Sequence, residues 1–311
     1  MRDGCKNFGG DGGTKTFSIM SAEHDGGGGG GGGDDICPIS VILAEEEIDK
    51  LSLLHNGVAS ELQHHFIRSI NSTLAIRQLP SRGLSFQLWP AATTLVKLLD
   101  EQRSHPETSP LTPTLTALRD GSDRRTLEVL EIGSGTGLVG IAAAATLGAI
   151  VTVTDLSHVI PNLQFNVEAN AEVLAANGGR VQVAPLHWGE AIDTELIGRE
   201  FELVLASDVV YHDHLYDPLL QTLRSFLLGG GNPKMVFLMA HLRRWKKDSA
   251  FFKKARKLFE VEVLHTDPPP PGARIGVVVY RFAARQSKKS AVGSANEGKG
   301  EMLVKYLHSG P

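Results

Sequence analysis

The sequence predicts an α/β fold in which a largely parallel sheet carries helices on both faces. From residue 127 onward, short apolar runs of strand length alternate with segments of helical periodicity. Such alternation predicts parallel strands joined by right-handed helical crossovers. The last two apolar runs follow one another without a helix between them, which predicts one antiparallel strand. A glycine-rich turn at residues 133–137 follows the first strand, at the position where such sheets bind ligands.

The elements of this sheet can be assigned in chain order. Strands are predicted at residues 127–132, 150–154, 180–186, 201–207, 234–240, 261–265 and 275–282. Helices are predicted at residues 138–147 and 251–259. A third helix is predicted to begin after an N-cap at Ser157, and a fourth runs from Asp213 or Asp217 to Leu227. The strands make a seven-stranded sheet, and residues 126–283 form the core domain around it.

A smaller N-terminal segment, residues 36–103, precedes the sheet. It contains a predicted hairpin with strands at residues 66–69 and 73–77. A helix is predicted from Pro90 to about Gln102, because proline suits the first turn of a helix. We interpret this hairpin and helix as a cover over the ligand site of the larger domain.

Three further stretches are predicted to lie outside the packed core. Residues 104–125 hold three prolines and several serines and threonines, which is typical of an exposed loop insertion. Residues 1–35 end in an unbroken run of glycine, and residues 284–311 are rich in serine, lysine and glycine. Both tails are predicted to be disordered, because such sequences bury too little surface to offset the entropy of ordering.

Composition narrows the classes of function. The 311 residues carry a net charge of -4 and the calculated pI is about 6.3, which argues against bulk electrostatic binding of nucleic acid. Cys5 and Cys37 show no zinc-site spacing and make no disulfide framework, which favours a reducing compartment. No apolar run approaches the roughly 20 residues that span a bilayer. We therefore expect a monomer without membrane association, in the cytoplasm, with the nucleus left open.

The turn at residues 133–137 predicts a nucleotide-type ligand. Gly133 and Gly135 allow a sharp bend and a close approach of the backbone to a ligand, which a Cβ atom would prevent. The helix that follows directs free N–H groups at that ligand. Asp155 ends the next strand, which places a carboxylate beside the turn, where it can accept hydrogen bonds from both ribose hydroxyls.

Two cofactors fit this geometry, and the sequence favours S-adenosylmethionine. Gly135 to Gly140 also match the dinucleotide pattern G-x-G-x-x-G, so a dehydrogenase stays an alternative, as does a turn that is merely tight. Glu131 suits the amino-acid end of S-adenosylmethionine and would repel a pyrophosphate. None of the four tyrosines begins a Tyr-x-x-x-Lys pair for hydride transfer, and the paired terminal strands fit a methyltransferase better.

Four sequence blocks together resemble a known family. The blocks are LWPAA at residues 88–92, EIGSGTG at 131–137, LHWG at 186–189 and ASDVVY at 206–211. They resemble family 16 of the seven-β-strand methyltransferases, which includes many protein-lysine methyltransferases, and the resemblance covers roughly residues 66–282. It implies a Rossmann-like seven-stranded methyltransferase sheet with a small N-terminal extension. It also implies S-adenosyl-L-methionine as the cofactor and a lysine-bearing protein as the substrate.

The resemblance implies cofactor-binding roles for positions along the chain. Trp89 would close over the methionine end of the cofactor. Gly133, Ser134 and Gly135 would contact its amino-acid part, and Asp155 would bind the ribose. The plainer alternatives are a tryptophan that packs in the core and an aspartate that only shapes a turn.

Further implied roles concern the far side of the pocket and the substrate mouth. Trp188 would flank the adenine, and Ser207 would line the pocket with its backbone. Asp208 and Tyr211 match an acidic-x-x-aromatic motif and are the expected catalytic residues. Asp208 would orient the lysine nitrogen or help to remove its proton, and Tyr211 would form one wall. The plainer alternatives are core packing of Trp188 and an Asp208 that caps the next helix.

The remaining features leave several functions open. Residues 243–247 and the lysines and arginines at 253–257 are either a solvated face or a dock for an acidic partner. The stretch at 206–211 lacks the Asn/Asp-Pro-Pro-Tyr loop that grips planar amides and base amines, which argues against those substrates. A methyltransferase for a small molecule or another side chain stays an alternative. A non-catalytic module with this fold is a second alternative, although the intact turn argues against it.

Overall fold

The computed structural model describes residues 61–120, 126–197, 200–229, 232–244, 246–269 and 276–285. The predicted glycine-rich tail at 1–35, both cysteines, and residues 286–311 of the predicted C-terminal tail lie outside the described residues. So do residues 36–60 of the N-terminal segment, residues 121–125 of the insertion and Trp245 of the basic segment.

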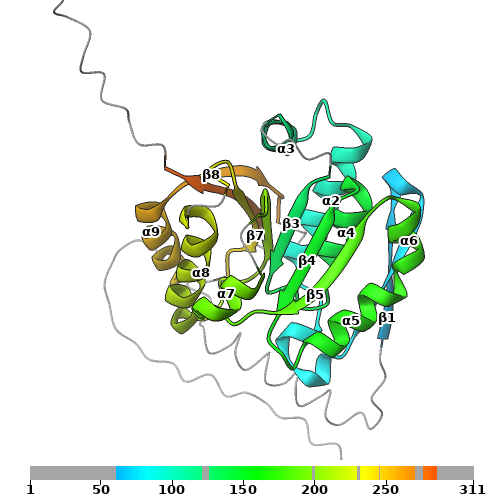
Figure 1. Ribbon diagram of the computed structural model, residues 1–311, viewed down its shortest axis with the longest axis horizontal. Helices are drawn as coiled ribbons and strands as arrows, with labels where there is room; N and C mark the ends of the chain where they lie inside the picture. The colour runs from blue at the N-terminus through cyan, green and yellow to red at the C-terminus, as the bar shows by residue number, and fades with distance from the viewer. Residues whose placement is uncertain are drawn as a thin grey trace, which may run out of the picture.

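A seven-stranded sheet forms the centre of the molecule, as the sequence predicts (Figure 1). Its strands are β3 (Glu128–Ile132), β4 (Ile150–Asp155), β5 (Arg180–Pro185), β6 (Leu203–Ser207), β7 (Val236–Leu242), β8 (Phe259–Thr266) and β9 (Val277–Ala284). The spatial order is β5-β4-β3-β6-β7-β9-β8. The first five strands along the chain pair in parallel, and β9 runs antiparallel to both of its neighbours. The order reverses between β3 and β6, and ligands bind α/β sheets at such a switch point.

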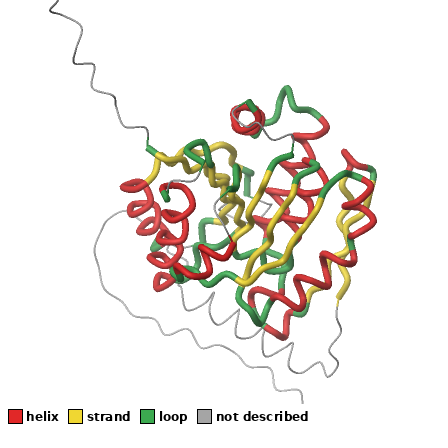
Figure 2. Tube along the Cα trace, in the orientation of Figure 1, coloured by secondary structure: helices red, strands yellow, loops and turns green. Residues whose placement is uncertain are grey.

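Helices cover both faces of this sheet (Figure 2). One face carries α2 (Pro90–Ser104), α4 (Leu138–Leu147), α5 (Ile160–Ala169) and α6 (Ala171–Ala176), whose buried side chains belong to one apolar core. The other face carries α8 (Tyr216–Leu228) and α9 (Asp248–Leu258), which bury aromatic side chains in a second core. Helix α4 is buried almost all round, as its alanine-rich sequence requires, because it packs against strands and against α2.

The structure corrects four details of the prediction. Within the predicted loop at 104–125, the described residues 104–120 are not an exposed loop, because they contain helix α3 (Thr112–Arg119) with Leu115 and Leu118 buried in the core. Helix α5 begins at Ile160 without a side-chain cap, so the predicted cap at Ser157 is wrong. A short helix, α7 (Ala191–Ile197), was missed. Phe259, expected at the end of a helix, begins β8 instead.

The predicted hairpin is present, but its first strand begins and ends earlier than the expected 66–69, so Arg68 and Ser69 lie in the connection. Strand β1 (Glu61–Ile67) pairs antiparallel with β2 (Ser72–Gln78), and the two make a separate two-stranded sheet. The connection is a short 3-10 helix, η1 (Arg68–Ile70), followed by Asn71 in the left-handed region, which asparagine tolerates better than most residues. In Figure 1 the hairpin lies beside α5 and α6 at the edge of the molecule.

Three buried asparagines attach the hairpin to the larger domain, and we call them the asparagine ladder. Asn162, Asn166 and Asn170 follow one another at four-residue spacing along one face of α5 and its end. The Asn170 amide accepts from the backbone N–H of Ala75 at 2.9 Å and donates to its carbonyl at 2.9 Å. The ladder therefore bonds the free edge of β2 as a neighbouring strand would.

Asn166 occupies the centre of this ladder. Its Oδ1 accepts from the N–H of Arg77 at 2.8 Å, and its Nδ2 donates to the Arg77 carbonyl at 3.1 Å. The same Nδ2 donates to the carbonyl of Thr136 in the glycine-rich turn at 2.9 Å. One fully buried amide thus joins the hairpin to the turn.

We expect Asn166→Ala to lower the free energy of unfolding by about 2–4 kcal/mol, because it leaves the Arg77 N–H and the Thr136 carbonyl without their partner. Urea denaturation followed by circular dichroism measures this loss. The control is Gln164→Ala on the exposed face of the same helix, which should change stability little. Equal stabilities for the two variants would contradict the bridging role of Asn166.

Candidate active site

A cavity of about 310 Å³ opens at the carboxyl ends of the parallel strands. This volume is at the lower end of the range for small-molecule sites. The cavity brings together nine residues that the sequence singled out: Trp89, Gly133, Ser134, Gly135, Asp155, Trp188, Ser207, Asp208 and Tyr211. They come from the N-terminal segment and from the segments at the ends of β3, β4, β5 and β6.

Backbone and side-chain hydrogen bonds pin the glycine-rich turn to the neighbouring strand β4. The N–H of Ser134 donates to the Thr154 carbonyl at 2.9 Å, and the N–H of Gly135 donates to Asp155 Oδ2 at 2.8 Å. Gly135 has φ +56, and a Cβ atom there would lie 3.1 Å from the Ser85 carbonyl oxygen. The turn therefore needs glycine both for its left-handed backbone and for the approach of the N-terminal segment.

Asp155 presents a buried carboxylate at the edge of the cavity. Its Oδ2 accepts from Gly135, and its Oδ1 accepts from the N–H of Leu156 at 2.8 Å. Burial raises the pKa of Asp155, while the two backbone N–H donors oppose that rise. Carboxylate oxygens keep further lone pairs, so Asp155 can still accept hydrogen bonds from a ligand hydroxyl.

Glu131 is the one predicted cofactor-binding residue that does not line the cavity. Its side chain is fully buried behind the turn, where Oε2 accepts from the N–H of Gly140 at 2.9 Å. A Cβ atom at Gly140 would lie 2.6 Å from that oxygen and 2.3 Å from Val153 Cγ1. Packing thus accounts for Gly140, the last glycine of the dinucleotide pattern. Glu131 holds α4 against β3 and does not make the direct contact with the ligand that the sequence predicted.

The N-terminal segment covers the cavity through a chain of local hydrogen bonds. The Trp89 indole Nε1 donates to the Leu84 carbonyl at 3.0 Å, and the N–H of Leu88 donates to Gln78 Oε1 at 2.7 Å. Gln78 ends β2, so the hairpin determines where Trp89 lies. Trp89 is half-buried at the cavity wall and is not an ordinary core tryptophan, although its contact with a cofactor stays a prediction.

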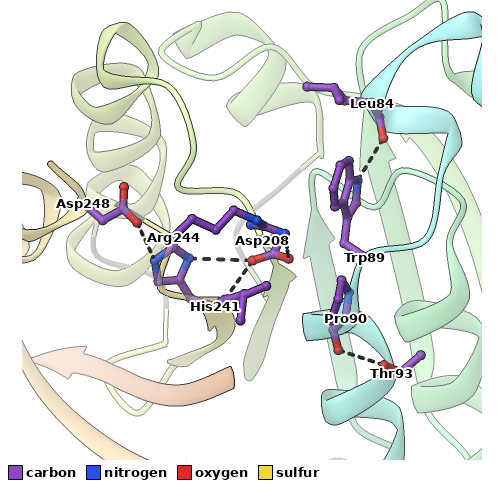
Figure 3. A network of polar contacts seen from close by, with 9 residues as sticks. Leu84, Trp89, Pro90, Thr93, Asp208, His241, Arg244 and Asp248 are labelled. Atoms are coloured by element: carbon purple, nitrogen blue, oxygen red, sulfur yellow. Dashed lines mark hydrogen bonds and ion pairs between the residues drawn. The ribbon is translucent and has the colours of Figure 1, made fainter. Parts of the chain in front are cut away.

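Asp208 lies in an unusual backbone conformation at the end of β6. It has φ +54, and its N–H donates to the Ala240 carbonyl at 2.9 Å. Its Oδ1 accepts from the N–H of Leu242 at 2.9 Å, and its Oδ2 accepts from Arg244 Nη2 at 3.0 Å. Asp208 is therefore no helix cap, and its carboxylate is paired. Figure 3 shows Arg244 reaching Asp208, with the His241 ring between Asp208 and Asp248.

Tyr211 forms part of the same wall. The centre of its ring lies 4.7 Å from the centre of the His212 ring. The His212 ring stacks on the His214 ring, with the two centres 5.3 Å apart. Burial raises the pKa of the Tyr211 hydroxyl, and the charge of Asp155 raises it further. The phenol is thus neutral and available as a hydrogen-bond donor at neutral pH.

The sequence prediction missed Arg244 as a cavity residue. Arg244 was part of the basic segment, read as a solvated face or a dock. One signal was available: it lies two residues after Leu242, the end of β7, at the sheet edge where ligands bind. Other members of the segment do face solvent, and Lys254 pairs with Asp217 at 2.7 Å.

Among the described residues, no three His, Cys, Asp or Glu side chains cluster in a way that could hold a metal ion. In the same part of the chain, every helix is too short or too polar to span a membrane.

The buried position of Glu131 predicts a pH dependence of stability. Burial raises the pKa of Glu131 from 4.5 to about 8, so the folded protein keeps a proton that the unfolded chain releases between those two pH values. The free energy of unfolding should fall as the pH rises through this window, and Glu131→Gln should remove that loss. Urea unfolding of both proteins between about pH 5 and about pH 8 measures it. A stability difference that does not change with pH would refute the assignment.

Comparison with known proteins agrees with this geometry. The chain matches a family described as "Lysine methyltransferase" over residues 69–258. It is 31% identical to "Protein N-lysine methyltransferase METTL21A" of Danio rerio over 244 residues, which are 78% of this chain and 95% of that protein. It is 30% identical to "EEF1A lysine methyltransferase 3" of Mus musculus, over 66% of this chain and 74% of that protein.

Among solved structures, a SAM-dependent methyltransferase from Agrobacterium tumefaciens aligns with a TM-score of 0.48 and 14% identity, over 74% of this chain and 72% of that one. The four sequence blocks predicted the family correctly: the chain belongs to the lysine methyltransferases.

Proposed function

We propose that this protein uses S-adenosylmethionine to methylate lysine side chains of a protein substrate. The observation that carries the proposal is the meeting, in one cavity, of the glycine-rich turn, the Asp155 carboxylate and the Asp208–Tyr211 motif. The relatives named as protein N-lysine methyltransferases support a protein substrate. The relative named for EEF1A makes that protein the first substrate to test.

The residues around the turn fit the proposed cofactor. Gly133 lets the Trp188 indole pack close to the turn, since a Cβ atom there would lie 2.9 Å from the indole ring. The flat indole at the cavity wall suits a purine, and the Asp155 carboxylate suits ribose hydroxyls. S-adenosylmethionine held by the glycine-rich turn and Asp155 would supply a methyl group that is already activated for transfer to an amine nitrogen.

The protein then has two tasks, which are alignment and control of the amine. Free lysine has a pKa near ~10.4, so most of it is protonated at neutral pH and has no lone pair for the reaction. Burial of the amine at a mouth walled by Trp89 and Tyr211 would disfavour the charged ammonium form, because it removes water from the charge. Alignment of amine and methyl group in a fixed cavity supplies the rest of the acceleration.

Two rivals differ in what the protein binds or transfers. A dehydrogenase would be stabilised by NAD or NADP, whereas a methyltransferase is stabilised by S-adenosylmethionine. A methyltransferase for small molecules would label no protein. The match to a lysine methyltransferase family weakens the dinucleotide alternative. The packing of Gly140 does not separate the two, because the third glycine of a dinucleotide site also packs the helix against the strand.

The first test is cofactor binding, measured by calorimetry and thermal shift with S-adenosylmethionine, NAD and NADP. We expect stabilisation by S-adenosylmethionine alone. Asp155→Ala should weaken binding at least roughly tenfold, because it removes the ribose acceptor and the partner of the Gly135 N–H. Asp217→Ala, an exposed aspartate outside the cavity, is the matched control and should bind normally. Stabilisation by a dinucleotide alone would overturn the proposed function.

The second test is methyl transfer from tritiated cofactor to recombinant EEF1A and to a cell lysate. We expect label in protein, on lysine after hydrolysis. Asp208→Ala should keep cofactor binding and lose at least about 90% of turnover, because the group that orients the amine is gone. Label only in small molecules would refute a protein substrate. Loss of cofactor binding together with turnover would refute the substrate-side role of Asp208.

A further inference from the structure

Arg244 connects two sides of the cavity mouth that come from distant parts of the chain. Its guanidinium bonds Asp208 Oδ2 at 3.0 Å, and its Cζ lies 5.1 Å from the centre of the Trp89 ring. We propose that Arg244 is a positioning residue that neutralises Asp208, so that the mouth accepts the substrate amine in its uncharged, reactive form. This inference rests on the proposed function, because it assigns a task to Arg244 within that reaction.

The geometry holds the guanidinium in one place. The side chain of Asp208 is 3% exposed and that of Arg244 is 16% exposed, so water screens the pair little. A guanidinium presents several donors in a plane and also packs on an aromatic face. The contact with Trp89 is at the distance of a cation–π interaction. Arg244 thus meets the requirements of a fixed positive charge at the mouth.

The opposite side of Asp208 is closed by a second buried group. The ring of His241 is 1% exposed and lies between Asp208 Oδ1, 3.7 Å from Nδ1, and Asp248 Oδ2, 3.3 Å from Nε2. The Tyr216 hydroxyl donates to Asp248 Oδ1 at 3.3 Å. Asp208 is therefore the point at which this buried polar cluster reaches the cavity, and Arg244 is the charge nearest to it.

The charge of Asp208 matters because of the chemistry of the amine. An unpaired carboxylate beside lysine would favour the ammonium form, which has no lone pair to form a bond. Pairing with Arg244 offsets that bias, because the positive charge of the guanidinium opposes the negative charge of the carboxylate at the amine. Each oxygen of Asp208 keeps a lone pair beyond its present bond, so it can still accept an N–H from the neutral amine.

The charge balance of the reaction agrees with this role. The neutral amine gains the methyl group and becomes a methylammonium, while the sulfonium becomes a neutral thioether, so the positive charge moves from sulfur to nitrogen. The methylammonium later releases one proton to water. Arg244 has to keep the amine neutral before transfer, and it takes no proton itself because arginine stays protonated in proteins.

Other titratable groups lie around Asp208 and Arg244. Asp155 at the end of β4, His187 after β5, and Tyr211 and His212 after β6 line the cavity. His241 on β7 is buried beside Asp208, and Asp248 on α9 is buried beside His241. These residues are the same in all the variants compared below, but loss of the Arg244 charge acts on them as well as on Asp208. The variant that lacks both charges is therefore needed to assign a shift to the Arg244–Asp208 pair.

The experiment is the pH dependence of methyl transfer at saturating cofactor, with the protein that the wild-type enzyme labels, EEF1A or the labelled lysate protein. For Arg244→Met we expect the midpoint of the rate to move upward by about one pH unit or more, since the amine then meets an uncompensated carboxylate. Arg244→Lys should keep the midpoint near that of the wild type. Arg243→Met, which removes the exposed neighbouring charge, should also keep the wild-type midpoint.

A double variant and a second readout separate charge from structure. Asp208→Asn combined with Arg244→Met removes both charges and should return the midpoint toward that of the wild type. Urea unfolding without substrate should show Arg244→Met losing stability as pH rises, and the double variant should lose less. Arg244→Gln, which keeps polarity without charge, replaces Arg244→Met if that variant does not fold.

The pH midpoint tests the role of Arg244, and lysine labelling by the wild type tests the proposed function. A midpoint for Arg244→Met or Arg244→Gln equal to that of the wild type would overturn the role of Arg244, while lysine labelling by the wild type would still support the proposed function. Absence of lysine labelling by the wild type would instead sink the proposed function.

Discussion

The hydrogen bonds of Asn166 impose the constraint on which the site depends. A single buried amide joins the backbone of Arg77 in the hairpin to the carbonyl of Thr136 in the glycine-rich turn. The outer edge of β2 has no neighbouring strand among the described residues, so its polar groups need other partners. An asparagine amide offers a donor and an acceptor together, as a strand does. The N-terminal hairpin and the glycine-rich turn are thereby held in one arrangement, with Trp89 at the cavity wall.

Three buried carboxyl groups around the cavity show how environment decides the role of one functional group. Glu131 lies behind the turn, bonds a backbone N–H and has a strongly raised pKa, so it acts as a structural group. Asp155 accepts two backbone N–H donors and still faces the cavity. Asp208 is paired with Arg244 at the opposite wall. The surroundings of each carboxyl group, which are burial, backbone N–H donors or a paired cation, thus determine the role of Glu131, Asp155 and Asp208.

Much of the fold followed from periodicity and turn residues. The strands were predictable because apolar runs of strand length are bounded by glycine or polar residues. Two final runs without a helix between them predicted one antiparallel strand, and the structure shows that it is β9. Helix α3 was missed because Pro110 and Pro113 suggested a loop, whereas Pro113 lies in the first turn of the helix, where proline fits. Buried Leu115 and Leu118 outweighed that local signal. Tertiary packing commonly overrides local propensity in this way.

The sequence alone determined the class of the fold, the edge of the sheet that carries the site, and the positions of Gly133, Gly135 and Asp155 at that edge. Those features depend on local patterns, because the ends of parallel strands must meet at one edge. The other six predicted residues that line the cavity came from the resemblance to the methyltransferase family. The tertiary structure decided which side chains face each other there. In the folded chain the Glu131 side chain lies outside the cavity. Arg244, which is 36 residues from Asp208 in the chain, contacts the Asp208 carboxylate. Periodicity carries no information about such pairings, because they depend on rotamers and on loops between distant strands.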